Sequence, residues 1–125
     1  VVHADATTVA DPGQPLARLA GQVAVVVTNP PYIPDAMVPR EPEVRNHDPH
    51  LALFGGRDGL DVARGVVVTA ARLLRDGGLF AMEHADVQGD SVLELFGPQW
   101  RDVTDHRDYN GLPRFVTARR VRMAQ

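Results

Sequence analysis

Two short runs of consecutive apolar residues predict buried strands. Val23–Val27 is a continuous β-branched run, and Leu79–Met82 is a second apolar run further along the chain. Apolar runs without polar alternation are typical of strands in a parallel sheet that is covered on both faces. Between the two runs, apolar residues recur at helical spacing and predict one amphipathic helix that packs on the sheet. This stripe consists of Leu60, Ala63, Val67, Ala70 and Leu74.

Local signals predict where the helices begin and end. Asp58 is the expected N-cap of the first helix, and Gly77-Gly78 is its expected stop. A second, shorter helix is predicted to be capped by Asp86 and closed by Gly97-Pro98.

The C-terminal part reads as a strand pair. Trp100–His106 and Phe115–Val121 are the predicted strands, separated by the turn signal Tyr109–Pro113. The predicted order is strand, long loop, helix, strand, helix, strand, strand. Such alternation indicates an α/β fold with a parallel three-layer sheet, to which the last pair adds an antiparallel element.

One long stretch, Asn29–Asp58, has no periodicity. It contains six of the ten prolines of the chain. An irregular segment of this length is usually functional or disordered, and its prolines and scattered apolar residues favour a stiff, partly packed loop.

Composition narrows the classes of protein. The 125 residues suit one domain, and 44% hydrophobic with 23% charged residues is typical of a globular protein. The absence of cysteine excludes disulfides, thiol nucleophiles and cysteine zinc sites. The longest apolar run has five residues, too few to span a bilayer, and no signal peptide is visible, so a cytoplasmic location is expected. A net charge of −3 argues against binding nucleic acid by charge alone.

The chemistry is concentrated in Asn29-Pro30-Pro31-Tyr32, directly after the first strand. In open α/β sheets, ligands bind at the carboxyl ends of the strands. The Asn29 side-chain oxygen is an acceptor, the rigid backbone makes the Pro30 carbonyl a second acceptor, and Tyr32 offers a flat aromatic face. Two acceptors and a flat face suit a planar –NH2 group that is presented to an electrophile. The alternative is an Asx-Pro turn that only ends the strand.

This tetrapeptide resembles the signature of amino-methyltransferases that use S-adenosylmethionine. A longer co-linear pattern is similar to the release factor N5-glutamine methyltransferases. That pattern comprises Asn29–Pro34, Glu41–Val44, His47–Gly56, Asp58–Leu60, Glu83-His84, Arg107–Tyr109, Gly111 and Arg114.

The resemblance implies a class I, Rossmann-like methyltransferase fold with S-adenosylmethionine as cofactor. It implies that Asn29 and Pro30 bind the amide of a glutamine in a Gly-Gly-Gln motif, with Pro31 and Tyr32 beside it. Asn29, Pro30 and Tyr32 would then be the catalytic residues, with no general base required, because orientation and electrostatics carry the methyl transfer. Cofactor contacts are implied for Asn29 and for Asp5-Ala6, whose stretch resembles a loop that lies against the adenine.

The chain departs from this family in one respect. A Gly-rich cofactor loop after a first strand is absent, as is an acidic residue that would hold the ribose. The chain also opens with Val1 rather than Met. We therefore expect residues 1–125 to be the C-terminal part of one catalytic domain, with an apolar strand edge at Val23–Val27 and weak binding of S-adenosylmethionine.

Other polar residues have less specific readings. His47–His50 is expected to be a turn and not a metal site, and no metal is implied. Glu83-His84 is expected to position the loop, with a catalytic role as the alternative. Arg114 and Asp108 are expected to brace the terminal strand pair. The arginine cluster at 119, 120 and 122 reads as a solvated sheet end, with contact to RNA or a release factor as the alternative.

Three functions follow from these readings. The first is methylation of glutamine in a peptide-chain release factor, with neither a membrane nor nucleic acid as partner. The second is methylation of an amino group on a DNA or RNA base, against which the acidic pI counts. The third is a non-catalytic remnant that binds a partner.

Overall fold

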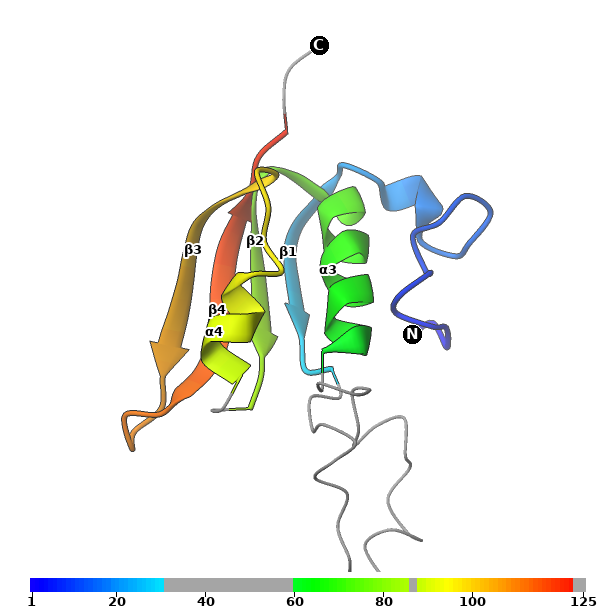
Figure 1. Cartoon of the computed structure of the whole chain (residues 1–125). Coiled ribbons are helices and arrows are strands. Elements are labelled where there is room, and N and C mark those ends of the chain that lie inside the picture. The colour runs from blue at the N-terminus through cyan, green and yellow to red at the C-terminus, as the bar shows by residue number, and fades with distance from the viewer. Residues whose placement is uncertain (31–59, 86–87, 123–125) are drawn as a thin grey trace, which may run out of the picture.

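A computed structural model describes residues 1–30, 60–85 and 88–122. Its centre is a four-stranded sheet in the order β1-β2-β4-β3 (Figure 1). The elements are η1 (Ala17–Leu19), β1 (Val23–Thr28), α3 (Asp61–Leu73), β2 (Leu74–Glu83), α4 (Gly89–Leu93), β3 (Trp100–Arg107) and β4 (Pro113–Arg120). Each of the four predicted strands and both predicted helices are present.

The sheet mixes parallel and antiparallel pairs. β1 runs parallel to β2, with Val26 opposite Phe80, and α3 is the crossover between them. β4 pairs antiparallel with both β2 and β3. The predicted α/β class, with a terminal antiparallel pair, is confirmed.

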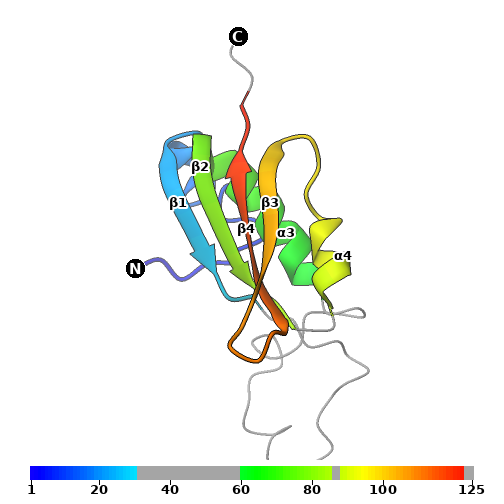
Figure 2. The same ribbon diagram turned by 90° about the vertical axis from the view of Figure 1, so that its left-hand side faces the viewer.

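Both described helices lie on the same face of the sheet (Figure 2). The side chains of Val25 and Val27 point away from them and are 53% and 75% exposed. The prediction that this apolar run is buried on both faces is wrong for the described residues, in which α3 and α4 cover one face of the sheet. β1 is also an edge strand, so the expected apolar edge is confirmed.

The core lies between the sheet and the helices. β2 contributes the fully buried Phe80 and Met82. The predicted stripe is buried too: Ala63, Val67 and Ala70 lie in α3, Leu60 is its N-cap and Leu74 begins β2. Phe80, Phe96 and Trp100 form an aromatic cluster with ring centroids 5.4–6.0 Å apart. This cluster attaches the segment after α4 to β2 and β3.

The helix boundaries differ from the sequence signals. The N-cap of α3 is Leu60, with no side-chain cap bond, and Asp58 lies outside the described residues. α3 ends at Leu73, and Gly77 lies inside β2 with a φ of 76°. The strand thus begins before the glycine pair, because Leu74 is fully buried against the core. The N-cap of α4 is Gln88, and the expected cap Asp86 is not described.

The arginine cluster supplies N–H donors to carbonyl groups at the C-terminus of α3. Arg120 Nε donates to the Ala71 carbonyl at 2.7 Å, and Arg122 Nη2 donates to Ala71 and Arg72 at 2.9 and 2.6 Å. Arg120 is buried, and that burial, with the nearby Arg122, lowers its pKa. The prediction of a solvated sheet end is therefore wrong for Arg120, because the last carbonyls of a helix need donors and attract cations.

The two faces of the sheet predict different costs of truncation. Phe80→Ala is expected to lower the free energy of unfolding by about 3–5 kcal/mol, because it empties the centre of the core. Val25→Ala removes a side chain that is half exposed and is expected to cost below about 1 kcal/mol. Urea unfolding of both variants measures the difference. Equal losses would contradict the one-sided core.

Candidate functional site

The carboxyl ends of β1 and β2 border an open hollow of about 610 Å³, on the face of the sheet that α3 and α4 do not cover. Its described lining is mostly apolar, with polar groups at the rim. The lining residues are Val27, Thr28, Asn29, Ala81, Met82, Glu83, Arg114 and Phe115. The hollow lies where parallel α/β sheets bind ligands.

Asn29 stands at this hollow, as the sequence predicted. It follows the last residue of β1 and is exposed, whereas the next residue, Pro30, is buried. The oxygen of the Asn29 side-chain amide can accept a hydrogen bond from a molecule bound in this hollow. Pro31 and Tyr32 lie outside the described residues.

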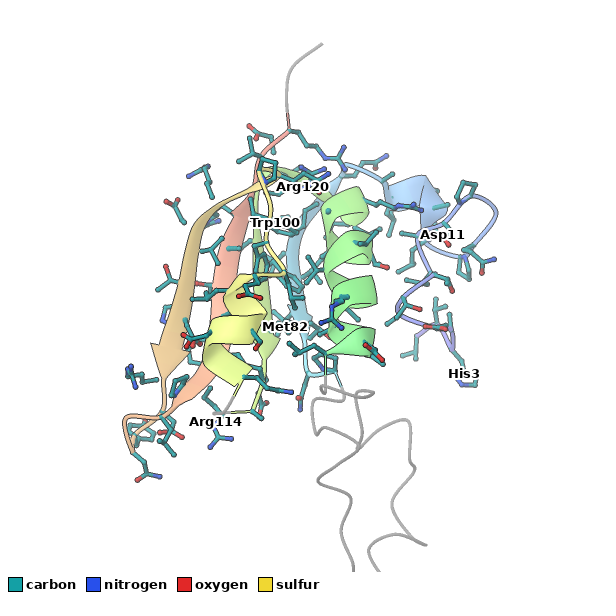
Figure 3. The ribbon with its side chains drawn as sticks, in the orientation of Figure 1. His3, Asp11, Met82, Trp100, Arg114 and Arg120 are labelled. Atoms are coloured by element: carbon teal, nitrogen blue, oxygen red, sulfur yellow. The ribbon has the colours of Figure 1, made fainter. Side chains whose placement is uncertain are left out.

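Asp5 and Ala6 do not belong to the described lining of the hollow. The Asp5 carboxylate accepts from the backbone N–H and the hydroxyl of Thr7, at 2.9 and 2.7 Å, and these bonds lower its pKa. A Cβ on Gly65 of α3 would stand 2.6 Å from a Thr7 methyl, so this segment packs on α3. In Figure 3, the labelled His3 lies on the side of α3 that faces away from the sheet.

His84 is fully buried directly after β2. One ring nitrogen, Nδ1, lies 2.7 Å from the Ala85 carbonyl, and the other, Nε2, lies 2.7 Å from Asp105 Oδ1 of β3. The histidine therefore fastens the end of β2 to the neighbouring strand pair. That Glu83-His84 positions the long loop stays a prediction, because residues 31–59 lie outside the described ranges. Among the described residues, His84 contacts Ala85 and Asp105, and Glu83 lines the hollow.

Gly89 completes this arrangement from α4. A Cβ at this position would stand 2.8 Å from Asp105 Oδ2 and 3.2 Å from Pro113 Cβ. Only glycine lets the start of α4 approach the carboxylate that holds His84.

The β3–β4 hairpin beside the hollow is fixed by Asp108. Its Oδ1 accepts from the backbone N–H groups of Asn110 and Leu112, at 2.8 and 3.1 Å. Arg114 Nε donates to the other oxygen, Oδ2, at 3.3 Å. The expected brace between Arg114 and Asp108 is confirmed. Arg114, which is labelled beside the hairpin in Figure 3, also lines the hollow.

The hairpin bonds change the titration of Asp108. Its pKa is lowered mainly by the bond from the Leu112 N–H; desolvation opposes this effect, and the Asn110 N–H and Arg114 lower the pKa further. The ionised form is therefore the one that holds the turn.

The described residues contain no group of three or more His, Cys, Asp or Glu side chains that could hold a metal ion. Residues 47–50 lie outside the described ranges. No helix among the described ranges is long and apolar enough to cross a membrane.

Comparisons with known proteins identify the relatives of the chain. A release factor glutamine methyltransferase from Streptomyces coelicolor is 54% identical over 108 residues, 82% of this chain. One from Mycobacterium tuberculosis is 52% identical over 122 residues, 96% of this chain. The chain is homologous to part of the release factor glutamine methyltransferases. It spans 38% of the length of each of these two relatives.

A further relative and a solved structure add to this result. A 4-amino-L-phenylalanine/4-methylamino-L-phenylalanine methyltransferase from Streptomyces pristinaespiralis is 51% identical over 79 residues, 63% of this chain and 27% of that protein. The crystal structure of a release factor-specific protein-(glutamine-N5) methyltransferase from Alicyclobacillus acidocaldarius matches with a TM-score of 0.52 and 24% identity. That match covers 94% of this chain and 56% of the other, and it shows the methyltransferase fold. No protein-family model matches the sequence.

Sequence reasoning missed the wall of the hollow opposite Asn29. Phe115 lies there, with its ring stacked on His106 at 4.6 Å. The sequence places Phe115 in a strand, but only the register of β4 against β2 brings it beside Glu83.

Substitution of Gly89 is expected to disturb the end of β2. Gly89→Ala should lower the free energy of unfolding by about 1–3 kcal/mol, because the added methyl overlaps Asp105 and Pro113. Gly97→Ala is the matched control, since a Cβ there meets nothing within 4 Å. Urea unfolding measures both variants, and an equal, small effect would contradict the close approach at Gly89.

The hairpin is expected to loosen only in acid. A lowered pKa in the folded state means that Asp108 contributes its stabilisation above the ordinary aspartate value of 3.8, and that this contribution is lost as the pH falls through the lower folded value. The amide proton shifts of Asn110 and Leu112 should therefore stay constant from neutral pH down to about that value. A transition well above it would contradict the assignment. In Asp108→Asn the acid transition should disappear.

Proposed function

We propose that the chain is the acceptor-binding part of an S-adenosylmethionine-dependent protein-glutamine N5-methyltransferase that acts on a peptide-chain release factor in the cytoplasm. The observation that carries the proposal is the place of Asn29 at the mouth of the hollow after β1, in a chain about half identical to named release factor glutamine methyltransferases.

The residues fit the methyl acceptor in two ways. Asn29 supplies a side-chain oxygen, and the Pro30 carbonyl is proposed as the second acceptor for the two N–H bonds of the glutamine amide. Val27, Ala81 and Phe115 make the wall apolar. With the –NH2 held by both hydrogens, its nitrogen faces one direction, and orientation of this kind accounts for much of enzymatic rate acceleration.

The cofactor fits the described residues less completely. S-adenosylmethionine supplies a methyl group on a positively charged sulfur when bound. Asn29 is proposed to contact it, as are Asp5 and Ala6, although Thr7 next to them packs on α3 at Gly65. We propose Pro31 and Tyr32 as further contacts of the acceptor, with Tyr32 catalytic through its aromatic face. Residues 1–125 are proposed to be the C-terminal part of one catalytic domain.

A second candidate acceptor has a specific observation in its favour. The relative from Streptomyces pristinaespiralis is named for an aromatic amine substrate. An aniline nitrogen and an amide nitrogen are both planar –NH2 groups attached to a π-system, so the same two acceptors would hold either one. A small aromatic amino acid is therefore the alternative substrate.

Methyl transfer by the 125-residue chain tests the proposal. Calorimetry should show weak binding of S-adenosylmethionine or none, and release factor incubated with a millimolar concentration of it should be methylated slowly on glutamine, as read by mass spectrometry. Asn29→Ala should reduce the rate by about 100-fold or more, as for the loss of one preorganised hydrogen-bonding group. Val68→Ala, on the exposed side of α3, is the control.

Three other results would change the conclusion. Tight stoichiometric cofactor binding would contradict the expected incomplete site. Methylation of 4-amino-L-phenylalanine without methylation of release factor would favour the second candidate. An Asn29→Ala variant as active as the parent chain would overturn the role of Asn29.

A further inference from the structure

A second hollow lies at the β3–β4 hairpin and shares two lining residues with the first. The second hollow, of about 440 Å³, is lined by Arg107, Asp108, Tyr109, Arg114 and Phe115. Arg114 and Phe115 line both hollows. The two hollows therefore adjoin at Arg114 and Phe115, and together they border Asn29 at the end of β1 and Tyr109 in the hairpin; we call this pair of hollows the groove.

The far end of this groove presents apolar side chains to solvent. Tyr109 is fully exposed, and Leu112 and Phe115 are each about 40% exposed. Tyr and Arg are the side chains that most often contribute strongly to binding energy at protein interfaces.

The hairpin that carries Tyr109 is held in one conformation. The Asp108 carboxylate accepts two backbone N–H bonds across the turn, and Arg107 Nη1 donates to the Gly111 carbonyl at 2.6 Å. The turn backbone is closed by Asp108 N–H to the Leu112 carbonyl at 2.9 Å. A turn fixed in this way loses little conformational freedom when a partner binds it.

We propose that this hairpin rim, residues 107–115, is a docking surface for the polypeptide that carries the acceptor glutamine. The inference rests on the proposed function, because a glutamine side chain in the hollow belongs to a chain that must leave it along a surface. The groove toward Tyr109 is that surface in the described structure.

The spacing of the strands sets the distance between Asn29, at the end of β1, and the hairpin. Strands lie about 4.8 Å apart, so the three steps from β1 to the hairpin span about 14 Å. An extended peptide advances about 3.3 Å per residue, so the rim contacts residues about four positions from the glutamine. A substrate shorter than this fills the hollow without touching Tyr109.

Peptides of two lengths test the proposal. The probes are acetyl-Gly-Gly-Gln-amide and a release factor peptide of about fifteen residues centred on the same glutamine, each titrated into the 125-residue chain by NMR chemical shifts. The long peptide should shift signals at both Asn29 and Tyr109, and the tripeptide should shift those at Asn29 alone.

Variants of Tyr109 separate docking from folding. Tyr109→Ala should weaken binding of the long peptide about tenfold and leave the tripeptide unchanged, as for the loss of an interface aromatic side chain. Tyr109→Phe should retain most of the affinity, because it keeps the ring. Val68→Ala removes another exposed apolar side chain, from α3, and should change neither affinity.

The outcomes distinguish the two proposals. If the long peptide binds at the hollow and Tyr109→Ala has no effect, the docking surface is overturned and the proposed function stands. If neither peptide shifts signals at the hollow, both are overturned. If 4-amino-L-phenylalanine binds there and the long peptide does not, the docking surface is overturned in favour of the second candidate function.

Discussion

The parallel pairing of β1 with β2 is the constraint on which the rest of the structure depends. Parallel neighbours require a crossover, and α3 supplies it and covers one face of the sheet. The same pairing brings the carboxyl ends of both strands to one edge, where Asn29 and Glu83 line a common hollow. The proposed chemistry therefore follows from the direction of two strands.

Polar groups fasten each end of this sheet. At one end, Arg120 and Arg122 donate to the Ala71 and Arg72 carbonyls at the terminus of α3 and so join the end of the chain to the helix. At the other end, His84 links β2 to Asp105 of β3, and Gly89 lets α4 close over the pair. The hollow lies beside the His84–Asp105 contact, because Glu83, the residue before His84, lines it.

The hollow is mostly apolar because it lies on the face of the sheet that α3 and α4 do not cover. Val25 and Val27 remain exposed because the described helices lie on the opposite face. An apolar face and an unpaired strand edge are costly in water. The chain spans 38% of the length of the two release factor glutamine methyltransferases. We propose that further polypeptide covers this face and edge in the complete catalytic domain.

The sequence by itself determined the α/β class, the four strands, the two helices and the place of Asn29 after a strand. These depend on local periodicity and turn chemistry, which short segments contain in full. It also carried the kinship with the release factor methyltransferases, through motifs that keep their order along the chain. Only the tertiary structure decided that Arg120 caps α3, that His84 meets Asp105, and that Phe115 faces Asn29 across the hollow. Those contacts join residues that are far apart in sequence, and strand order and register bring them together.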